Sequence, residues 1–137
     1  MISWELNQEN GRSVNKKFLD EIIKLSFKVL KIKEAEVSIA IVSRYKIKKA
    51  NETYRKKKVV TDVLSFIYES KPLNGEILIC YDKIVVQAKK KGHSFKEELK
   101  ILLVHSLVHL AGYDHKKDND EKKMKKVEDI ILKKFSL

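Results

Sequence analysis

The sequence predicts an α+β fold, with a small mixed β-sheet of about four strands packed by helices. Two patterns indicate this class. Short segments alternate apolar with polar residues, or are apolar throughout, as is typical of strands, and longer segments between them repeat apolar residues at helical spacing. We expect one domain over residues 1–137, because the length suits a single core and no repeat or linker divides the chain.

The first half of the chain combines strands with two helices. Ile2, Trp4 and Leu6 alternate with polar residues, which indicates a short first strand. The next apolar pattern is helical, and Ser13 is its expected N-cap. In chain order we expect that first strand, a helix from Ser13 to Leu30, a strand over 37–41, a short helix over 44–54, an exposed loop at 56–58 and a strand over 63–67.

The second half is richer in helix. Pro72 and Gly75 are expected to bracket a turn before an apolar strand over 76–80, which should be central in the sheet. Two helices should follow, over 81–91 and from Ser94 to about 110, with Gly92 ending the first. A last helix from about 118 should turn five residues toward the core, namely Met124, Val127, Ile130, Ile131 and Phe135.

The helix after Ser94 carries the motif on which a functional prediction rests. It is apolar nearly all round, so we expect it to be the buried central helix of the domain. His105 and His109 lie four residues apart on it and therefore share one face. Gly112 allows the chain to turn back, which would bring His115 beside them. Three histidines with an open fourth position are typical of a catalytic zinc site.

The spacing His-x-x-x-His-x-x-Gly-x-x-His is that of the metzincin proteases, with one difference. Ser106 stands where those enzymes carry the glutamate that serves as general base. We interpret Ser106 as a small packing residue.

Asp114 is open to two interpretations: it could orient a metal ligand or act on a water, or it could be a turn residue bonded to its own backbone.

Composition narrows the class of protein. Cys80 is the only cysteine, which excludes an intramolecular disulfide and a cysteine metal cluster, and we expect it to be buried in its strand. No segment resembles a signal peptide or a membrane span, so we expect a cytoplasmic protein that does not bind membranes. The net charge of +11 suits a polyanion such as RNA, although lysines spread along the chain equally suit ordinary solvated surfaces.

Three blocks of the sequence resemble the YbeY family of zinc-dependent endoribonucleases. His105 to His115 is similar to the family's H-G-x-L-H-L-x-G-Y-D-H, with Ser106 and Val108 as differences. The block L-N-x-x-Y-R, then P-T-D-V-L-S-F-P, is matched by Asn51, Tyr54 and Arg55 and by residues 61–66; Val60 and Ile67 replace prolines. Residues 75–80 match a third block, G-D/E-I followed by an apolar strand.

This resemblance implies a zincin-like fold, one Zn²⁺ per chain on His105, His109 and His115, and a functional Arg55 in the same cleft. It implies single-stranded RNA, ribosomal RNA and the ribosome as partners. The implied activity is single-strand-specific endoribonucleolytic cleavage in ribosomal RNA processing, including 3′-end maturation of the small-subunit RNA, and in ribosome quality control. Asp62, Ser65 and Asp114 are further candidates to contact the ligands or the substrate.

The residues allow a mechanism for that activity. Zinc can supply an activated water near neutral pH for attack on an RNA phosphodiester, which would explain why a glutamate base is not needed. The guanidinium of Arg55 can hold a phosphate through two hydrogen bonds, although its position alone favours an ordinary surface arginine. Two alternatives remain at this stage: a zincin-like metalloprotease, and a non-catalytic ribosome-assembly factor with a structural zinc.

Overall fold

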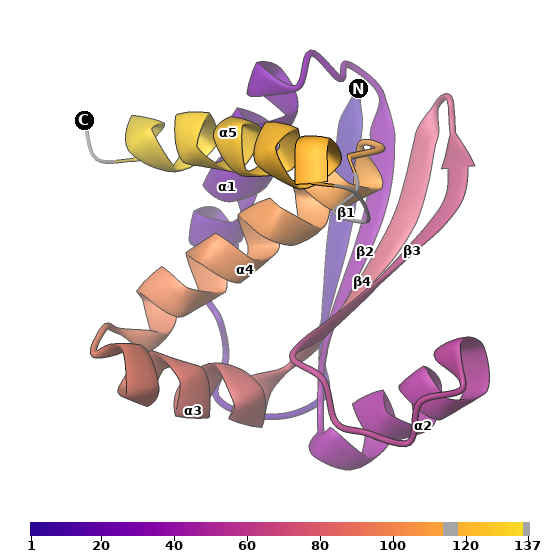
Figure 1. The fold of residues 1–137 in the computed structure, drawn as a ribbon, viewed down its shortest axis with the longest axis vertical. Coiled ribbons are helices and arrows are strands. Elements are labelled where there is room, and N and C mark those ends of the chain that lie inside the picture. Colours follow the sequence, from indigo (N-terminus) through magenta and orange to yellow (C-terminus); the bar gives the residue numbers. More distant parts are fainter. Residues whose placement is uncertain (114–117, 136–137) are drawn as a thin grey trace.

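The structure is a computed structural model that describes residues 1–113 and 118–135 (Figure 1). It confirms the predicted α+β class with a four-stranded mixed sheet. In chain order the elements are β1 (Ile2–Gln8), α1 (Lys16–Val29), β2 (Ala35–Val42), α2 (Arg44–Arg55), β3 (Val63–Ser70), β4 (Leu73–Cys80), α3 (Tyr81–Lys91), α4 (Phe95–Leu110) and α5 (Asp118–Lys134).

The four strands form one sheet in the order β1-β2-β4-β3. The first three are parallel to one another, and β3 is antiparallel to β4 at the edge of the sheet. The predicted central position of the strand ending at Cys80 is therefore confirmed. Because β3 is an edge strand, one of its sides stays open for a site beside the sheet.

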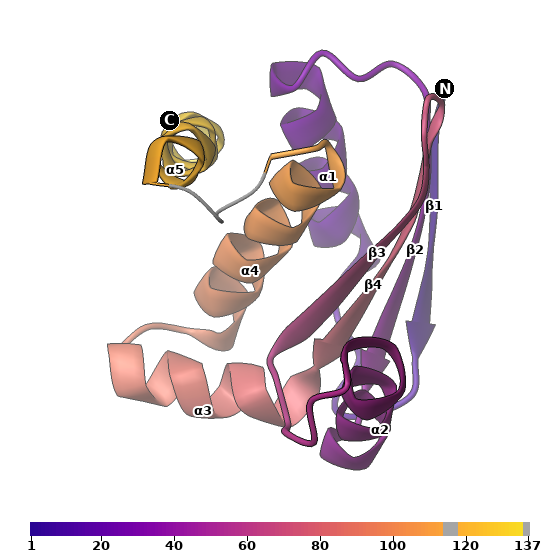
Figure 2. The ribbon, with the colours of Figure 1, turned by 45° about the vertical axis from the view of Figure 1, so that its right-hand side comes forward.

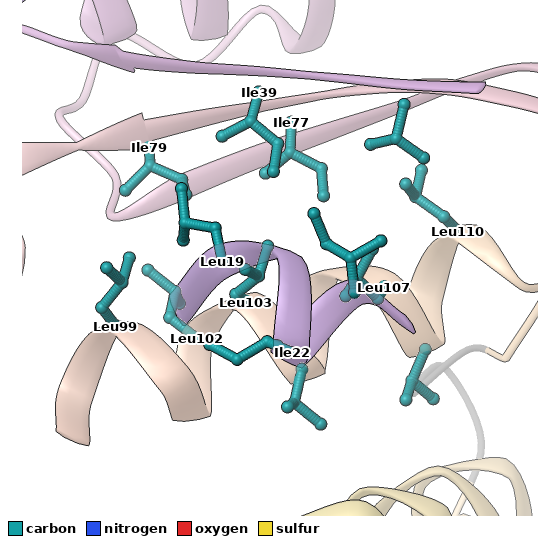
Figure 3. Packing of buried hydrophobic residues seen from close by; sticks show 14 of the residues in the cluster. Leu19, Ile22, Ile39, Ile77, Ile79, Leu99, Leu102, Leu103, Leu107 and Leu110 are labelled. Carbon is teal, nitrogen blue, oxygen red and sulfur yellow. The ribbon is translucent and has the colours of Figure 1, made fainter. Parts of the chain in front are cut away.

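Helices α1, α4 and α5 gather on one face of the sheet, as Figures 1 and 2 show from two directions. The main core lies between that face and α1 and α4. Figure 3 shows Leu19 of α1, Leu103 and Leu107 of α4, and Ile39 and Ile77 of the sheet converging in this layer, and Ile22 of α1 belongs to the same buried cluster. All six side chains are 0–1% exposed. Burial of this kind stabilises the fold by about 1.5–3 kcal/mol per side chain.

The opposite face of the sheet is covered in part by α2. Ile47 of α2 packs in a second, smaller cluster with sheet residues that include Val42 and Cys80. Burial of Cys80 is as predicted. Figure 2 shows α2 on the other side of the sheet from α4. This packing fixes the end of α2, and thereby Arg55, at the end of the sheet where β3 begins.

Helix α4 has the buried central position that its composition predicts. Its buried residues lie all round the helix and include Leu99, Leu103, Val104 and Val108. The predicted N-cap is confirmed, since the Ser94 hydroxyl oxygen accepts a hydrogen bond from the Glu97 amide at 3.0 Å.

Three local predictions were wrong. The N-cap of α1 is Asn15, whose side-chain oxygen accepts from the Phe18 amide, and Ser13 lies outside the helix. Gly75 lies within β4, where a Cβ would stand 2.9 Å from Leu110 Cδ2, so glycine is needed there for close helix packing. Ile130 is 43% exposed because the core-facing stripe of α5 runs through its neighbour Ile131 instead.

Within the described residues, none of the helices combines the length and the apolar character that crossing a membrane requires.

Candidate functional site

Helix α4 brings two of the predicted ligands together. His105 and His109, one helical turn apart, both line a small pocket of about 120 Å³. The helix ends directly after them, with Ala111 as C-cap. Gly112 follows at φ +104°, a conformation that side chains rarely adopt, so the chain can leave the helix axis there as predicted.

The ring of His109 is held in one tautomer by the chain that follows it. Its Nδ1 lies 3.1 Å from the backbone oxygen of Tyr113. A carbonyl oxygen only accepts hydrogen bonds, so Nδ1 is the nitrogen that carries the proton in this contact. A backbone carbonyl on the far nitrogen is a common support for a histidine that binds a metal.

The ring of His105 is held by a carboxylate from another helix. Its Nδ1 lies 2.5 Å from Oε1 of Glu128 in α5. The hydrogen bond to Glu128 raises the pKa of His105 above its usual 6.5, against the lowering effect of burial, and the negative charges of Glu128 and Asp62 act in the same direction. The carboxylate therefore makes the imidazole more basic, and Nε2 is again the nitrogen that would take a metal.

Arg55, Ser65 and Val63 complete the lining of this pocket. Arg55 is the last residue of α2, and its Nη2 donates a hydrogen bond to the backbone oxygen of Ser65 in β3 at 3.2 Å. The structure thus brings four of the sequence-predicted residues together: Arg55, Ser65, His105 and His109. The two imidazoles and the guanidinium lie around one small volume, although α2 and α4 pack on opposite faces of the sheet.

The loop after α2 is held by Asn51, which explains why an asparagine precedes Arg55 in this motif. Asn51 is 3% exposed, and its amide donates to the backbone oxygen of Val59 at 3.1 Å. Its own backbone oxygen accepts from the Lys57 amide. Tyr54 packs edge-on against Phe66 of β3, with ring centroids 5.2 Å apart. These contacts fix the end of α2 against β3 and so position Arg55.

Asp62 lies one step away from this pocket. It lines a larger neighbouring pocket of about 390 Å³, which also has His105 in its wall. Its two carboxylate oxygens accept hydrogen bonds from Thr61 Oγ1 and Gln87 Nε2, both at 3.3 Å. Asp62 is thus near His105 but separate from the small pocket that contains Arg55.

Ser106 occupies the interior of the molecule, as the sequence indicates. It is 1% exposed, and its hydroxyl donates to the backbone oxygen of Leu102 at 3.0 Å. A buried hydroxyl bonded within its own helix cannot act on a substrate, so this position carries no base.

The predicted third ligand, His115, and its neighbour Asp114 lie outside the described residues. Across residues 1–113 and 118–135, no cluster of three or more His, Cys, Asp or Glu could hold a metal ion. The two described histidines nevertheless fit a zinc site, because the Nδ1 of each ring contacts an oxygen atom that can orient the imidazole, as the partners of metal-binding histidines do.

Sequence reasoning missed Glu128. The segment from Asp118 to Asp129 contains several acidic residues, and from the sequence each of them can be interpreted as part of an exposed, charged helix face. Only the packing of α5 across α4 selects the carboxylate that reaches His105. Its side chain is 18% exposed, whereas that of Asp129 on the same helix is 51% exposed, and no feature of the sequence marks this difference.

The chain is similar to known endoribonucleases along nearly its whole length. The model of the family described as "Endoribonuclease YbeY" matches residues 3–136. Proteins named Endoribonuclease YbeY are 38% identical in Aquifex aeolicus, over 91% of this chain and 87% of the relative, and 41% identical in Ureaplasma urealyticum, over 82% and 76%. The solution structure of TM1509 from Thermotoga maritima is similar at a TM-score of 0.66, with 26% identity over 99% of this chain and 92% of that one.

Proposed function

The chain belongs to the family of YbeY endoribonucleases, and from this premise we propose that it cleaves single-stranded RNA during ribosomal RNA processing. The proposal includes 3′-end maturation of the small-subunit RNA, a part in ribosome quality control, and a cytoplasmic location beside the ribosome. The observation that carries it is the pocket in which Arg55 meets His105 and His109, within a chain that the family matches almost from end to end.

We propose that His105, His109 and His115 hold one Zn²⁺. The Nδ1 contacts of the two described histidines support this assignment, because an acceptor on Nδ1 is the usual partner of a histidine that ligates a metal through Nε2. When held there, zinc would supply Lewis acidity and an activated water near neutral pH.

The residues of the chain supply orientation and charge. The Glu128 carboxylate and the Tyr113 carbonyl hold the two imidazoles in place. Arg55 lines the same pocket with its guanidinium, which can bind the phosphate that is cut and stabilise the charge that the phosphate oxygens gain. The Ser65 carbonyl orients that guanidinium through one of its donors. Two or more N–H groups then remain for the phosphate, because a guanidinium carries five.

The two alternative functions would require different residues at this site. A zincin-like protease needs a general base, and the buried Ser106 offers none at the position where metzincins have it. A non-catalytic assembly factor with a structural zinc would need no arginine in the pocket. The position of Arg55 beside the histidines therefore favours the nuclease.

The test uses purified protein with defined zinc content and end-labelled RNA. Single-stranded and duplex forms of the same sequence are incubated with it, and the product ends are mapped. We expect cleavage of the single strand, loss of that cleavage in His109→Ala, and no digestion of a casein substrate. Folded, zinc-loaded protein that leaves RNA intact would favour the assembly factor, and casein digestion would favour the protease.

A further inference from the structure

The larger pocket beside the candidate active site has no assigned role. It lies between α3, α4 and α5 and the segment that precedes β3, and its volume is about 390 Å³. In Figure 1, α4 descends from α5 toward α3 along this side of the molecule. His105 lines both this pocket and the small one with Arg55, so the two are neighbours that share a wall. The volume is within the usual range for a small-molecule site.

The charges around this pocket exclude a phosphate as its occupant. Four carboxylates line it, against the ammonium groups of two lysines, Lys91 and Lys125. Of the carboxylates, Glu98 is paired with Lys91 at 3.2 Å and with His93 at 2.6 Å, and Glu128 contacts His105. A phosphate would meet net repulsion here, although the protein as a whole has a charge of +11. The neighbouring pocket with Arg55 is the one suited to phosphate.

Asp62 and Gln87 give the pocket its hydrogen-bonding character. The Asp62 carboxylate accepts from two neutral donors, the Thr61 hydroxyl and the Gln87 amide, both at 3.3 Å. These bonds fix its direction, and the two oxygens still have lone pairs for a further donor. Gln87 also lines the pocket, and its amide group carries a second acceptor oxygen. The side chains of Ile101, Leu102 and Leu132 add an apolar surface against which a flat ring can pack.

We infer that this side pocket receives one unstacked nucleobase of the RNA strand, next to the phosphate held at Arg55, and that it favours bases with an exocyclic amino group. The inference rests on the proposed function. A base in a single strand can turn out of the stack into a pocket and present its edge. Carboxylate and amide oxygens accept from the amino groups of cytosine, adenine and guanine. The O4 of uracil would instead face the Asp62 oxygens, and this repulsion disfavours uridine.

The test compares two pyrimidines, cytosine with its exocyclic amino group and uracil with O4 in the same place. Oligocytidylate and oligouridylate of equal length are offered to zinc-loaded protein, and both cleavage rates and affinities, the latter by fluorescence anisotropy, are measured. We expect the cytidine strand to be favoured about tenfold. An oligonucleotide of 2-pyrimidinone riboside, which lacks only the amino group of cytidine, should lose this advantage.

Variants locate the preference in the pocket. Gln87→Leu keeps the size of the side chain and removes its polar atoms, and Asp62→Ala removes the carboxylate. Both should bring the cytidine-to-uridine ratio close to one. Val86→Ala, on the same helix at an exposed position, should leave the ratio unchanged. Because the result is a ratio, a general loss of activity in a variant does not imitate it.

Equal affinity of the parent protein for both strands, or a full preference retained in Gln87→Leu and Asp62→Ala, would overturn the inference. The affinity measurement does not depend on cleavage. A protein that prefers cytidine but cuts neither strand would therefore refute the proposed function and leave the base pocket supported.

Discussion

Glu128→Gln should weaken zinc binding although Glu128 is not one of the proposed ligands. The substitution removes the negative charge that lies 2.5 Å from His105 Nδ1. A glutamine oxygen can still accept from Nδ1–H, so the ring should keep its tautomer and its direction. What is lost is the negative charge of Glu128, which adds to the effect of the hydrogen bond in raising the pKa of His105 and thereby strengthens it as a ligand.

The size of the effect follows from the surroundings of the pair. Loss of a partner that supports a metal-binding histidine usually costs 10- to 100-fold in metal affinity, or roughly 1.4–2.7 kcal/mol. The Glu128 side chain is 18% exposed, but that of His105 is 42% exposed, so solvent screens part of the interaction. We therefore expect about tenfold for Glu128→Gln. Glu128→Ala also frees the ring to rotate and should come closer to 100-fold.

Competition with a chromophoric zinc chelator at neutral pH gives the affinity of each variant. Glu121→Gln is the matched control, because it makes the same chemical change at an exposed position of the same helix. Circular dichroism checks that the variants fold. Zinc affinity equal to the parent's in a folded Glu128→Gln protein would refute the reasoning, since the contact with Nδ1 would then do nothing for a ligand.

Four further measurements test the site and the fold. Arg55→Lys and Arg55→Ala should retain zinc and fold normally yet cut single-stranded RNA at least tenfold more slowly, about 1.4 kcal/mol of transition-state stabilisation, and cleavage at the parent rate would remove Arg55 from the mechanism. Leu103→Ala, at a side chain that is 0% exposed, should lower the free energy of unfolding in a urea titration by roughly 2–5 kcal/mol, and a loss below ~0.5 kcal/mol would mean that this face is not core. Gly75→Ala should cost about 1–3 kcal/mol in the same titration, because the added Cβ would stand 2.9 Å from Leu110 Cδ2 and from a backbone oxygen, and an unchanged midpoint would contradict this close packing. Asp20, whose pKa is held below 3.8 mainly by the hydrogen bond from Trp4, should stabilise the fold above that pH and lose its contribution as the pH falls through the lowered pKa, so the deficit of Asp20→Asn at pH 7 should shrink on acidification.

The features that the sequence predicts correctly are those decided by local periodicity. Spacing by four residues places His105 and His109 on one face of any helix, whatever surrounds it. The apolar residues all round α4 leave it no stable place except the interior, where the structure has it. Apolar β4 is central for the same reason.

Predictions failed or were missing where the answer depends on the packing of distant segments. Gly75 carries a turn signal in the sequence, yet its role is to let Leu110 of α4 approach the sheet. Nothing near Glu128 in the sequence marks it as the partner of His105, because the crossing of α5 over α4 decides which carboxylate arrives there. The proximity of Arg55 to the histidines could likewise be predicted only from the family resemblance, because Arg55 lies on α2 and the histidines lie on α4, on opposite faces of the sheet.

The structure separates two kinds of RNA contact, contact with phosphates and contact with bases, that the net charge of the sequence does not distinguish. Basic residues outnumber acidic ones by 30 to 19 and are spread along the chain, so they should give RNA affinity that is independent of sequence and falls steeply with salt. The pocket beside His105 is instead lined by four carboxylates, and contacts there should depend little on salt because they involve a neutral base. Raising the salt concentration should therefore weaken the binding of oligocytidylate and oligouridylate by the same factor and leave their ratio intact. If the ratio fell together with the affinity, base preference and charge attraction would come from the same lysines, and the division between the two surfaces would be wrong.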